Sequence, residues 1–330
     1  MHSEANTAAT DSKPLWIKEL KKSARSTLSR HQSKSNHEEN KDPESSGNVE
    51  TLEVAKVEAE DSEDAKVEDL EVETDGAKVE ETGDGKTTSP ATRNGDKTGV
   101  QVRVKPHPQF PEIYQITLED GAHRLATRNF APGRNVYGER LIRMEGAEYR
   151  VWDAFRSKLA GGILKGLQTV PILPGHKVLY LGAASGTTPS HISDIVGEHG
   201  HVYCVEFAQR SLRELVTNVV AFRLNMSPFL ADARMPQKYS MFISGKVDDI
   251  YCDIAQPEQA KVLADNADVF LKEGGWVVHA VKAQSIDVTK EPSEVYQQEA
   301  KILRNRGFRV EQVVDLEPYD KAHAMIVAQR

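Results

Sequence analysis

Four polar residues close four consecutive apolar runs in the second half of the chain: Glu206, Asp232, Asp253 and Lys282. Parallel strands bring their carboxyl ends to one edge of a sheet, and ligands bind in the crevice outside that edge. Glu206 can accept hydrogen bonds from both hydroxyls of a ribose, and Asp232 suits the amino group of an adenine. Phe207 could cover the adenine face. Taken singly, such an Asp is also a common helix N-cap and such a Lys is commonly solvated. Together, the four predict that this edge recognises an adenosine.

A glycine-containing turn follows the first strand of this group and reads Gly-Ala-Ala-Ser-Gly-Thr-Thr from Gly182 to Thr188. Glycines let the backbone approach a ligand closely, and the hydroxyls of Thr187 and Thr188 and the free amides at a helix start can hydrogen-bond it. The spacing of Gly182 and Gly186 differs from the Gly-x-Gly-x-x-Gly of a dinucleotide clamp, and no P-loop motif is present. A tight strand-to-helix turn is the alternative interpretation. S-adenosylmethionine fits best, because it has the adenosine without phosphates.

The elements that must position these residues form an alternating pattern from residue 177 onward. The alternation predicts a Rossmann-like α/β fold, with a mostly parallel sheet of seven strands and helices on both faces. A small antiparallel β subdomain is expected at 100–150, followed by a helix over 151–168 at the start of the main domain, 151–330. The last two strands should form an antiparallel hairpin. The expected strands are 177–181, 202–207, 226–230, 247–252, 275–281, 308–315 and 324–328, and the expected helices between them are 189–196, 209–223, 234–244, 257–271 and 292–306.

The first 99 residues differ in composition from the rest. Residues 42–84 hold 17 acidic residues against three lysines and no aromatic residue, and repeat Ala-Lys-Val-Glu three times. Such a segment buries too little apolar area to offset chain entropy, so the sequence predicts a disordered, low-complexity extension. A thin apolar stripe over 14–30 is either a docking peptide or a frayed polar extension. The acidic segment either shields a nucleic-acid-binding face or aids solubility.

The net negative charge of the chain lies in that extension. The whole chain carries a formal charge of −8, and removing −14 for residues 42–84 and +3 for residues 1–41 leaves +3 for residues 85–330. The folded part could therefore bind RNA through a local patch. Cys204 and Cys252 lie in apolar runs and are expected to be buried free thiols in a reducing compartment. We expect no membrane span, no secretory signal and no metal site.

The chain from about Ile113 to Gln329 resembles fibrillarin, the RNA 2′-O-methyltransferase of box C/D ribonucleoproteins, and is most similar to archaeal members. The resemblance implies the seven-stranded methyltransferase sheet, a guide RNA that selects the site in rRNA or tRNA, a Nop-type scaffold and an L7Ae-type kink-turn-binding protein. It implies a cytoplasmic location in an archaeon, or a nucleolar one in a eukaryote. The matching segments are Asn135–Arg140, Arg156–Leu159, Val178–Thr188, Ser190–Gly197, Asp253–Pro257, Ser285–Pro292 and Leu316–Tyr319.

The resemblance also implies which residues form the site. Lys282 is interpreted as the base that deprotonates a ribose hydroxyl, with Lys158 as support and Asp253 orienting the groups. A lysine needs burial or a neighbouring cation to act in this way. The implied catalytic residues are Lys158, Asp253 and Lys282, and the implied cofactor contacts are Thr187, Thr188, Glu206, Phe207, Asp232, Ala233, Asp253 and Gln256, beside Gly182 and Gly186 in the turn.

One position departs from the family pattern. Ala322 stands where the family has Asp, while His323 is kept, and Asp320 is a candidate substitute. This departure leaves two rival interpretations. The chain could be a non-catalytic scaffold subunit of the same particle, or a protein glutamine methyltransferase on the same fold.

Overall fold

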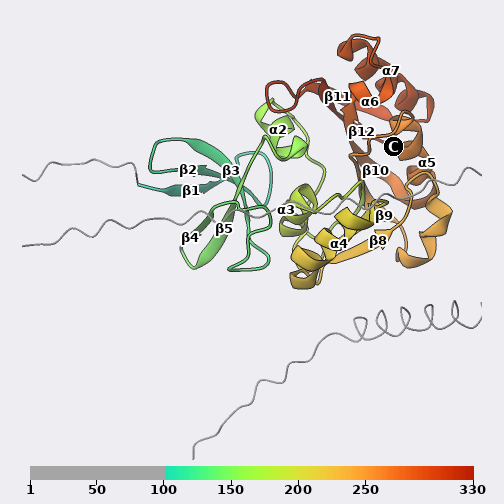
Figure 1. Cartoon of the computed structure of the whole chain (residues 1–330). Coiled ribbons are helices and arrows are strands. Elements are labelled where there is room, and N and C mark those ends of the chain that lie inside the picture. The colour runs from blue at the N-terminus through green and yellow to red at the C-terminus, as the bar shows by residue number, and fades with distance from the viewer. Residues whose placement is uncertain (1–100) are drawn as a thin grey trace, which may run out of the picture. The chain divides into compact units, whose positions relative to one another are not determined.

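The computed structural model describes residues 101–330, so the extension predicted at residues 1–99 lies outside the described residues. The described chain forms a five-stranded antiparallel sheet followed by a seven-stranded mixed sheet with helices on both faces (Figure 1). The small sheet has the order β1-β2-β3-β5-β4. Its strands are β1 (Arg103–Pro106), β2 (Ile113–Thr117), β3 (His123–Arg128), β4 (Leu141–Met144) and β5 (Ala147–Trp152).

The large sheet has the order β11-β12-β10-β9-β6-β7-β8, and β12 is antiparallel to both of its neighbours. This confirms the predicted seven strands and the terminal hairpin. The strands are β6 (Lys177–Leu181), β7 (His201–Glu206), β8 (Met226–Leu230), β9 (Val247–Cys252), β10 (Leu271–Lys282), β11 (Arg309–Asp315) and β12 (His323–Gln329). The α-helices are α2 (Lys158–Leu164), α3 (Thr187–Val196), α4 (Gln209–Asn218), α5 (Gln259–Phe270), α6 (Ala283–Ile286) and α7 (Pro292–Asn305).

The helix expected over 151–168 was wrong at its start. Val151 and Trp152 still belong to β5, where they pair with β3, and α2 begins only at Lys158. Phe155, one of the apolar residues whose spacing predicts that helix, is 69% exposed, so the spacing does not mark a buried helical face. The buried positions before α2 follow the alternation of a strand instead, so β5 extends past the boundary placed at residue 150.

The helix predicted over 234–244 was also wrong. Two short 3-10 turns, Pro236–Lys238 and Ser240–Phe242, take its place. Pro236 has no N–H to donate and starts the first turn, and Tyr239 separates the two. The buried Tyr239 hydroxyl donates to Asn266 on α5, so a tertiary contact replaces the helical pattern.

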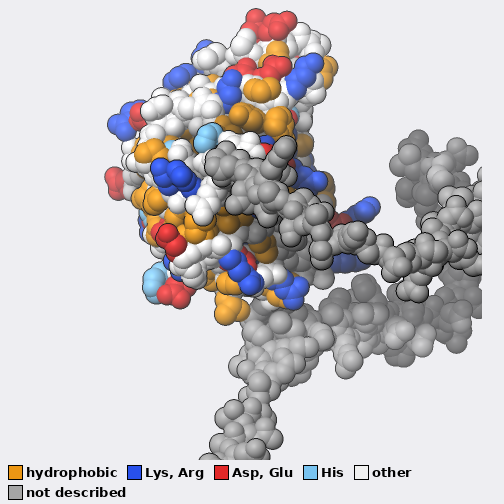
Figure 2. Space-filling model, turned by 90° about the vertical axis from the view of Figure 1, so that its left-hand side faces the viewer, with side chains coloured by type: hydrophobic (Ala, Val, Ile, Leu, Met, Phe, Trp, Pro, Cys, Tyr) orange, Lys and Arg blue, Asp and Glu red, His pale blue; other side chains and the backbone are white. Residues whose placement is uncertain are grey.

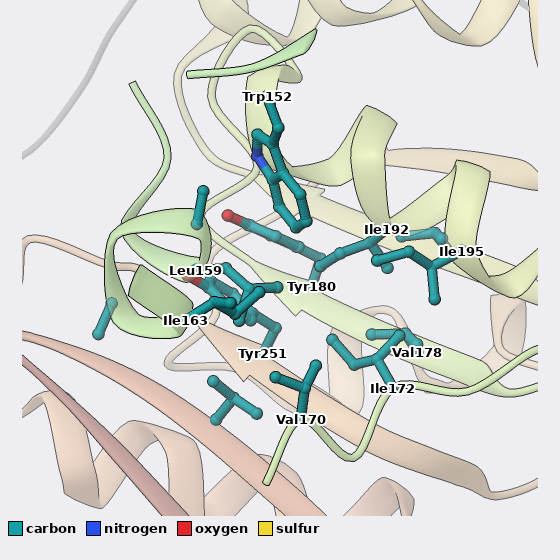
Figure 3. Packing of buried hydrophobic residues seen from close by; sticks show 14 of the residues in the cluster. Trp152, Leu159, Ile163, Val170, Ile172, Val178, Tyr180, Ile192, Ile195 and Tyr251 are labelled. Carbon is teal, nitrogen blue, oxygen red and sulfur yellow. The ribbon is translucent and has the colours of Figure 1, made fainter. Parts of the chain in front are cut away.

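One large hydrophobic cluster joins the small sheet to the large one. Trp152 of β5 points toward Tyr180 of β6, with Tyr251 of β9 beside it (Figure 3). Trp152 also stacks on His191 of α3, with ring centroids 4.6 Å apart. A second cluster fills the other face of the large sheet, beneath α5 and α7. The small sheet therefore contributes to the main core. A separate small cluster within that sheet consists of Ile116, Ala126 and Ile142.

A buried ionic cluster reinforces that junction. Asp194 of α3 binds two arginines, with Oδ2 2.9 Å from Arg150 Nη1 and Oδ1 2.6 Å from Arg223 Nη1. Arg150 also pairs with Glu139 at 2.6 Å, and the Thr127 hydroxyl donates to Asp194 at 2.7 Å. Buried charges persist only when they are paired and hydrogen-bonded, so this cluster fixes the small sheet against α3.

Both cysteines, Cys204 and Cys252, are buried free thiols, and burial raises the pKa of Cys252 to about 12. Across residues 101–330 we find no helix with the length and hydropathy that a membrane span requires.

Candidate active site

A cavity of about 380 Å³ opens at the carboxyl ends of the central strands. Strand order reverses here, because β6 lies between β7 and β9. The four predicted strand-end residues meet at this cavity, together with the first glycine of the turn. The predicted residues on its wall are Gly182, Glu206, Phe207, Asp232, Ala233, Asp253, Gln256 and Lys282.

Not every predicted cofactor contact lies on the cavity wall. Gly186, Thr187 and Thr188 are absent from it, whereas Ala184 and Ser211 line it and were not predicted. The sequence carried no signal for the last two, because a small side chain becomes informative only once its neighbours are placed.

Glu206 is held in one orientation by the backbone. Its Oε2 accepts the amide of Ala184 and its Oε1 accepts the amide of Ala208, both at 2.8 Å. Each oxygen keeps a further lone pair for a ligand. Asp232 is bound by Arg234, whose hydrogen bonds lower the pKa of that carboxyl below its ordinary value. The cavity thus presents two carboxylate groups at adjacent strand ends.

The two glycines of the turn are required by neighbouring protein atoms. Gly182 has φ +82°, and a Cβ there would lie 2.4 Å from the Asp253 carbonyl oxygen. Gly186 has φ +101°, and a Cβ there would lie 2.7 Å from Leu215 on α4. Gly182 therefore lets β6 and the Asp253 loop approach each other. Close packing therefore requires both glycines, and Gly182 also lies on the cavity wall.

We expect Gly182→Ala to weaken cofactor binding about tenfold or more, equal to about 1.4 kcal/mol, because the added methyl displaces the backbone of Asp253. Calorimetric titration with S-adenosylmethionine measures the effect. Gly197→Ala is the matched control, since Gly197 also has a positive φ, +66°, but has open space around its Cβ position. Equal affinities for the two variants would contradict the packing argument.

The three predicted catalytic residues form a continuous ion-paired cluster. Asp253 Oδ1 lies 2.9 Å from Lys282 Nζ, and Oδ2 lies 3.3 Å from Lys158 Nζ. Lys158 also lies 3.4 Å from Asp320, which is 3.0 Å from His323 Nδ1. Burial would raise the pKa of Asp320, but His323 and Lys158 outweigh it and lower that pKa. This series of ion pairs extends from the cavity wall to the connection between β11 and β12.

The two lysines are arranged differently from the expectation. The expectation placed the two ammonium groups near one another, and the structure places the Asp253 carboxylate between them, in contact with both. The backbone of Lys282 is fixed by Gln259, whose side chain accepts its amide and donates to its carbonyl. Reasoning from the residues alone missed Lys158, which lies 95 positions from Asp253, and only the resemblance pointed to it.

Ala322, at the position that departs from the family pattern, has φ +56°. Asp adopts this left-handed conformation more readily than Ala, so an Asp would suit the backbone here. The Asp320 carboxylate, two residues earlier, is the one that faces Lys158 and His323.

The sheet order with one reversed strand, and a cavity lined by carboxylates where that order reverses, fit the predicted methyltransferase fold and its site for S-adenosylmethionine. The fibrillarin family model matches residues 104–330. The chain belongs to the fibrillarin family.

Related sequences and solved structures match the chain over a similar share of its length. The fibrillarin-like rRNA/tRNA 2′-O-methyltransferase of Pyrobaculum calidifontis is 57% identical over 230 residues, which cover 69% of this chain and 98% of the relative. The crystal structure of Aeropyrum pernix fibrillarin, in complex with natively bound S-adenosyl-L-methionine, matches with a TM-score of 0.65 and 52% identity, covering 69% of this chain and 99% of that one. A fibrillarin/Nop5p complex matches with a TM-score of 0.57 and 43% identity, covering 67% and 98%.

Proposed function

We propose that this protein transfers a methyl group from S-adenosylmethionine to the 2′-hydroxyl of a ribose in rRNA or tRNA, as the catalytic subunit of a guide-directed box C/D ribonucleoprotein. The observation that carries the proposal is the Asp253 carboxylate, which binds Lys158 and Lys282 at the wall of the strand-end cavity. The names of the relatives support the reaction and its RNA substrates.

The cavity fits the proposed cofactor. Lys282 is the one cation among the described residues on its wall, and it is paired with Asp253 at 2.9 Å, so no spare cation is present for a phosphate. Glu206 offers lone pairs to ribose hydroxyls, and Phe207, 70% exposed, lies beside it to cover a flat ring. When bound, S-adenosylmethionine supplies an electrophilic methyl group on a sulfonium.

The remaining chemistry falls to the protein's own groups. The acceptor oxygen must lose its proton as it gains the methyl group, and we assign that proton to the pair of Lys282 and Asp253. Lys158 holds the second carboxylate oxygen and is itself held by Asp320. Holding the hydroxyl in line with the methyl group supplies much of the acceleration in reactions of this kind. In this assignment Asp320 takes the place of the Asp expected at Ala322.

The partners are proposed on the same basis. A relative assembles with Nop5p, which supports a Nop-type scaffold for this chain. A guide RNA and an L7Ae-type kink-turn-binding protein would complete the particle, and a cytoplasmic location stays a prediction.

Reconstitution tests the proposal. The chain mixed with a guide RNA, a Nop-type scaffold and an L7Ae-type protein should methylate the nucleotide that the guide selects, while the chain alone should show negligible site-specific activity. Mapping of 2′-O-methyl groups gives the readout, and a guide with a scrambled target sequence is the control. Full activity on free RNA, or methyl label found in protein instead of RNA, would refute the assignment.

A further inference from the structure

A second hollow, of about 880 Å³, lies between the small sheet and the segment that follows β11. We propose that this groove holds the RNA strand that carries the acceptor ribose, with arginines on its phosphates and Phe155 against a base or ribose. The inference rests on the proposed function and adds the site of the second substrate. The wall residues used in the argument are Arg124, Arg140, Phe155, Arg156 and Tyr319.

Two segments of the groove wall lead directly into the catalytic cluster. Its wall includes Phe155 and Arg156, which directly precede the segment of Lys158, and Tyr319, which precedes Asp320. Lys158 binds Asp320 on this side and Asp253 on the side of the cofactor cavity. The cluster of ion pairs therefore adjoins the groove wall in sequence on one side and lies on the cavity wall on the other. An in-line transfer needs its nucleophile to arrive from outside the cofactor cavity, and we assign that approach to the groove.

The charge of the groove favours a polyanion. The guanidinium groups of Arg124 and Arg156 have no carboxylate within 4 Å in the part of the chain that the structure describes, and both side chains are exposed. Arg140 is paired with Glu119 at the surface. Glu139 is buried against Arg150, and Asp153 accepts the amide of Phe155 but keeps its negative charge. The three arginines against these two carboxylates leave the wall with a net charge of +1, which RNA phosphates would neutralise.

An aromatic pair provides the second element of RNA recognition. Phe155 is 69% exposed and meets the ring of Tyr319 edge-on, with centroids 5.2 Å apart. Proteins bind unpaired RNA bases and ribose faces on aromatic side chains flanked by arginine. Figure 2 shows the side of the molecule on which the small sheet lies, where hydrophobic patches alternate with Lys and Arg side chains. Two arginines without a carboxylate partner among the described residues, beside an exposed aromatic pair, fit the phosphates and bases of RNA together, so we favour RNA as the occupant.

Kinetics of the reconstituted particle test the groove. Phe155→Ala and Arg156→Ala should each raise the KM for target RNA about fivefold to tenfold, with the affinity for S-adenosylmethionine unchanged. Loss of one phosphate contact should also reduce the slope of log affinity against log salt by about one. Arg304→Ala is the matched control, because Arg304 is exposed on α7 and absent from the groove wall.

A further variant and the remaining outcomes distinguish an RNA-binding groove from a structural effect or a protein-binding site. Arg156 donates to the Tyr137 carbonyl at 3.0 Å, so its loss could disturb the fold, whereas Arg124 donates to the carbonyl of its neighbour His123. Arg124→Ala, with thermal unfolding measured in parallel, therefore gives an independent reading. If the parent enzyme methylates normally and all three variants keep its KM and salt slope, the proposed RNA-binding role of the groove is wrong. The proposed function would be unaffected by that result. Reduced binding to the scaffold with unchanged RNA kinetics would assign the groove to the protein partner and overturn the proposal. A parent without activity would overturn the proposed function.

Discussion

Replacing Asp253 with Asn should lower the methyl-transfer rate of the reconstituted particle by a factor of about 10² to 10⁴, the range for loss of a positioned acid–base group. The carboxylate binds Lys282 at 2.9 Å and Lys158 at 3.3 Å. An amide keeps the shape but removes the negative charge, so the two ammonium groups lose their shared partner and the acceptor hydroxyl loses a group that can orient it or take its proton.

Single-turnover rates at saturating cofactor measure this effect apart from binding. Asp320→Asn is the graded control, because it removes the carboxylate at the other end of Lys158, 3.4 Å away, and leaves Asp253 in place. We expect a smaller loss for that variant. A wild-type rate for Asp253→Asn would remove Asp253 from the mechanism.

Replacing Asp194 with Ala should lower the free energy of unfolding by about 3–5 kcal/mol, the cost of breaking a buried ion pair by removing one partner. The Asp194 side chain is fully buried, and the substitution leaves the guanidinium groups of Arg150 and Arg223 in the core without it. The amide of Phe130, which Asp194 accepts at 2.9 Å, is also left unpaired. Denaturant unfolding of the full chain gives the measurement.

A surface carboxylate provides the matched control. Asp268 also binds two arginines, Arg306 and Arg330, each at 2.6 Å, but its side chain is 47% exposed. Asp268→Ala should cost less than about 1 kcal/mol, because water replaces the lost pairs. If the two substitutions had equal effects, burial would not be what makes the Asp194 cluster important.

The cofactor cavity could be predicted from the sequence because its residues obey one topological rule. Glu206, Asp232, Asp253 and Lys282 close successive strands, and parallel strands end at one edge, so their meeting requires no knowledge of side-chain packing. Lys158 obeys no such rule. It lies on α2, which precedes the alternating strands and helices of the large sheet, and only the family resemblance identified it as a site residue.

The errors share a physical origin. The patterns at 151–168 and 234–244 have helical spacing, yet Trp152 pairs with β3 as part of a strand, and the second segment forms two 3-10 turns around the buried Tyr239. Spacing records which residues are apolar and cannot say which partner buries them. The packing role of Gly182 could not be predicted for the same reason, since the atoms that exclude a Cβ there belong to a loop 71 residues away in sequence.

The buried cluster around Asp194 has a consequence for how the molecule folds and is inherited. Arg150 belongs to the small sheet and Asp194 to α3 of the main domain, and the ion pair between them is fully buried. The two parts should therefore gain and lose structure in one cooperative step, although the sequence pattern predicts a separate β subdomain. A gene fragment that encodes either part alone would keep one ion pair, Arg150 with Glu139 or Asp194 with Arg223, but would expose the apolar junction around Trp152, so we expect the two parts to be inherited together.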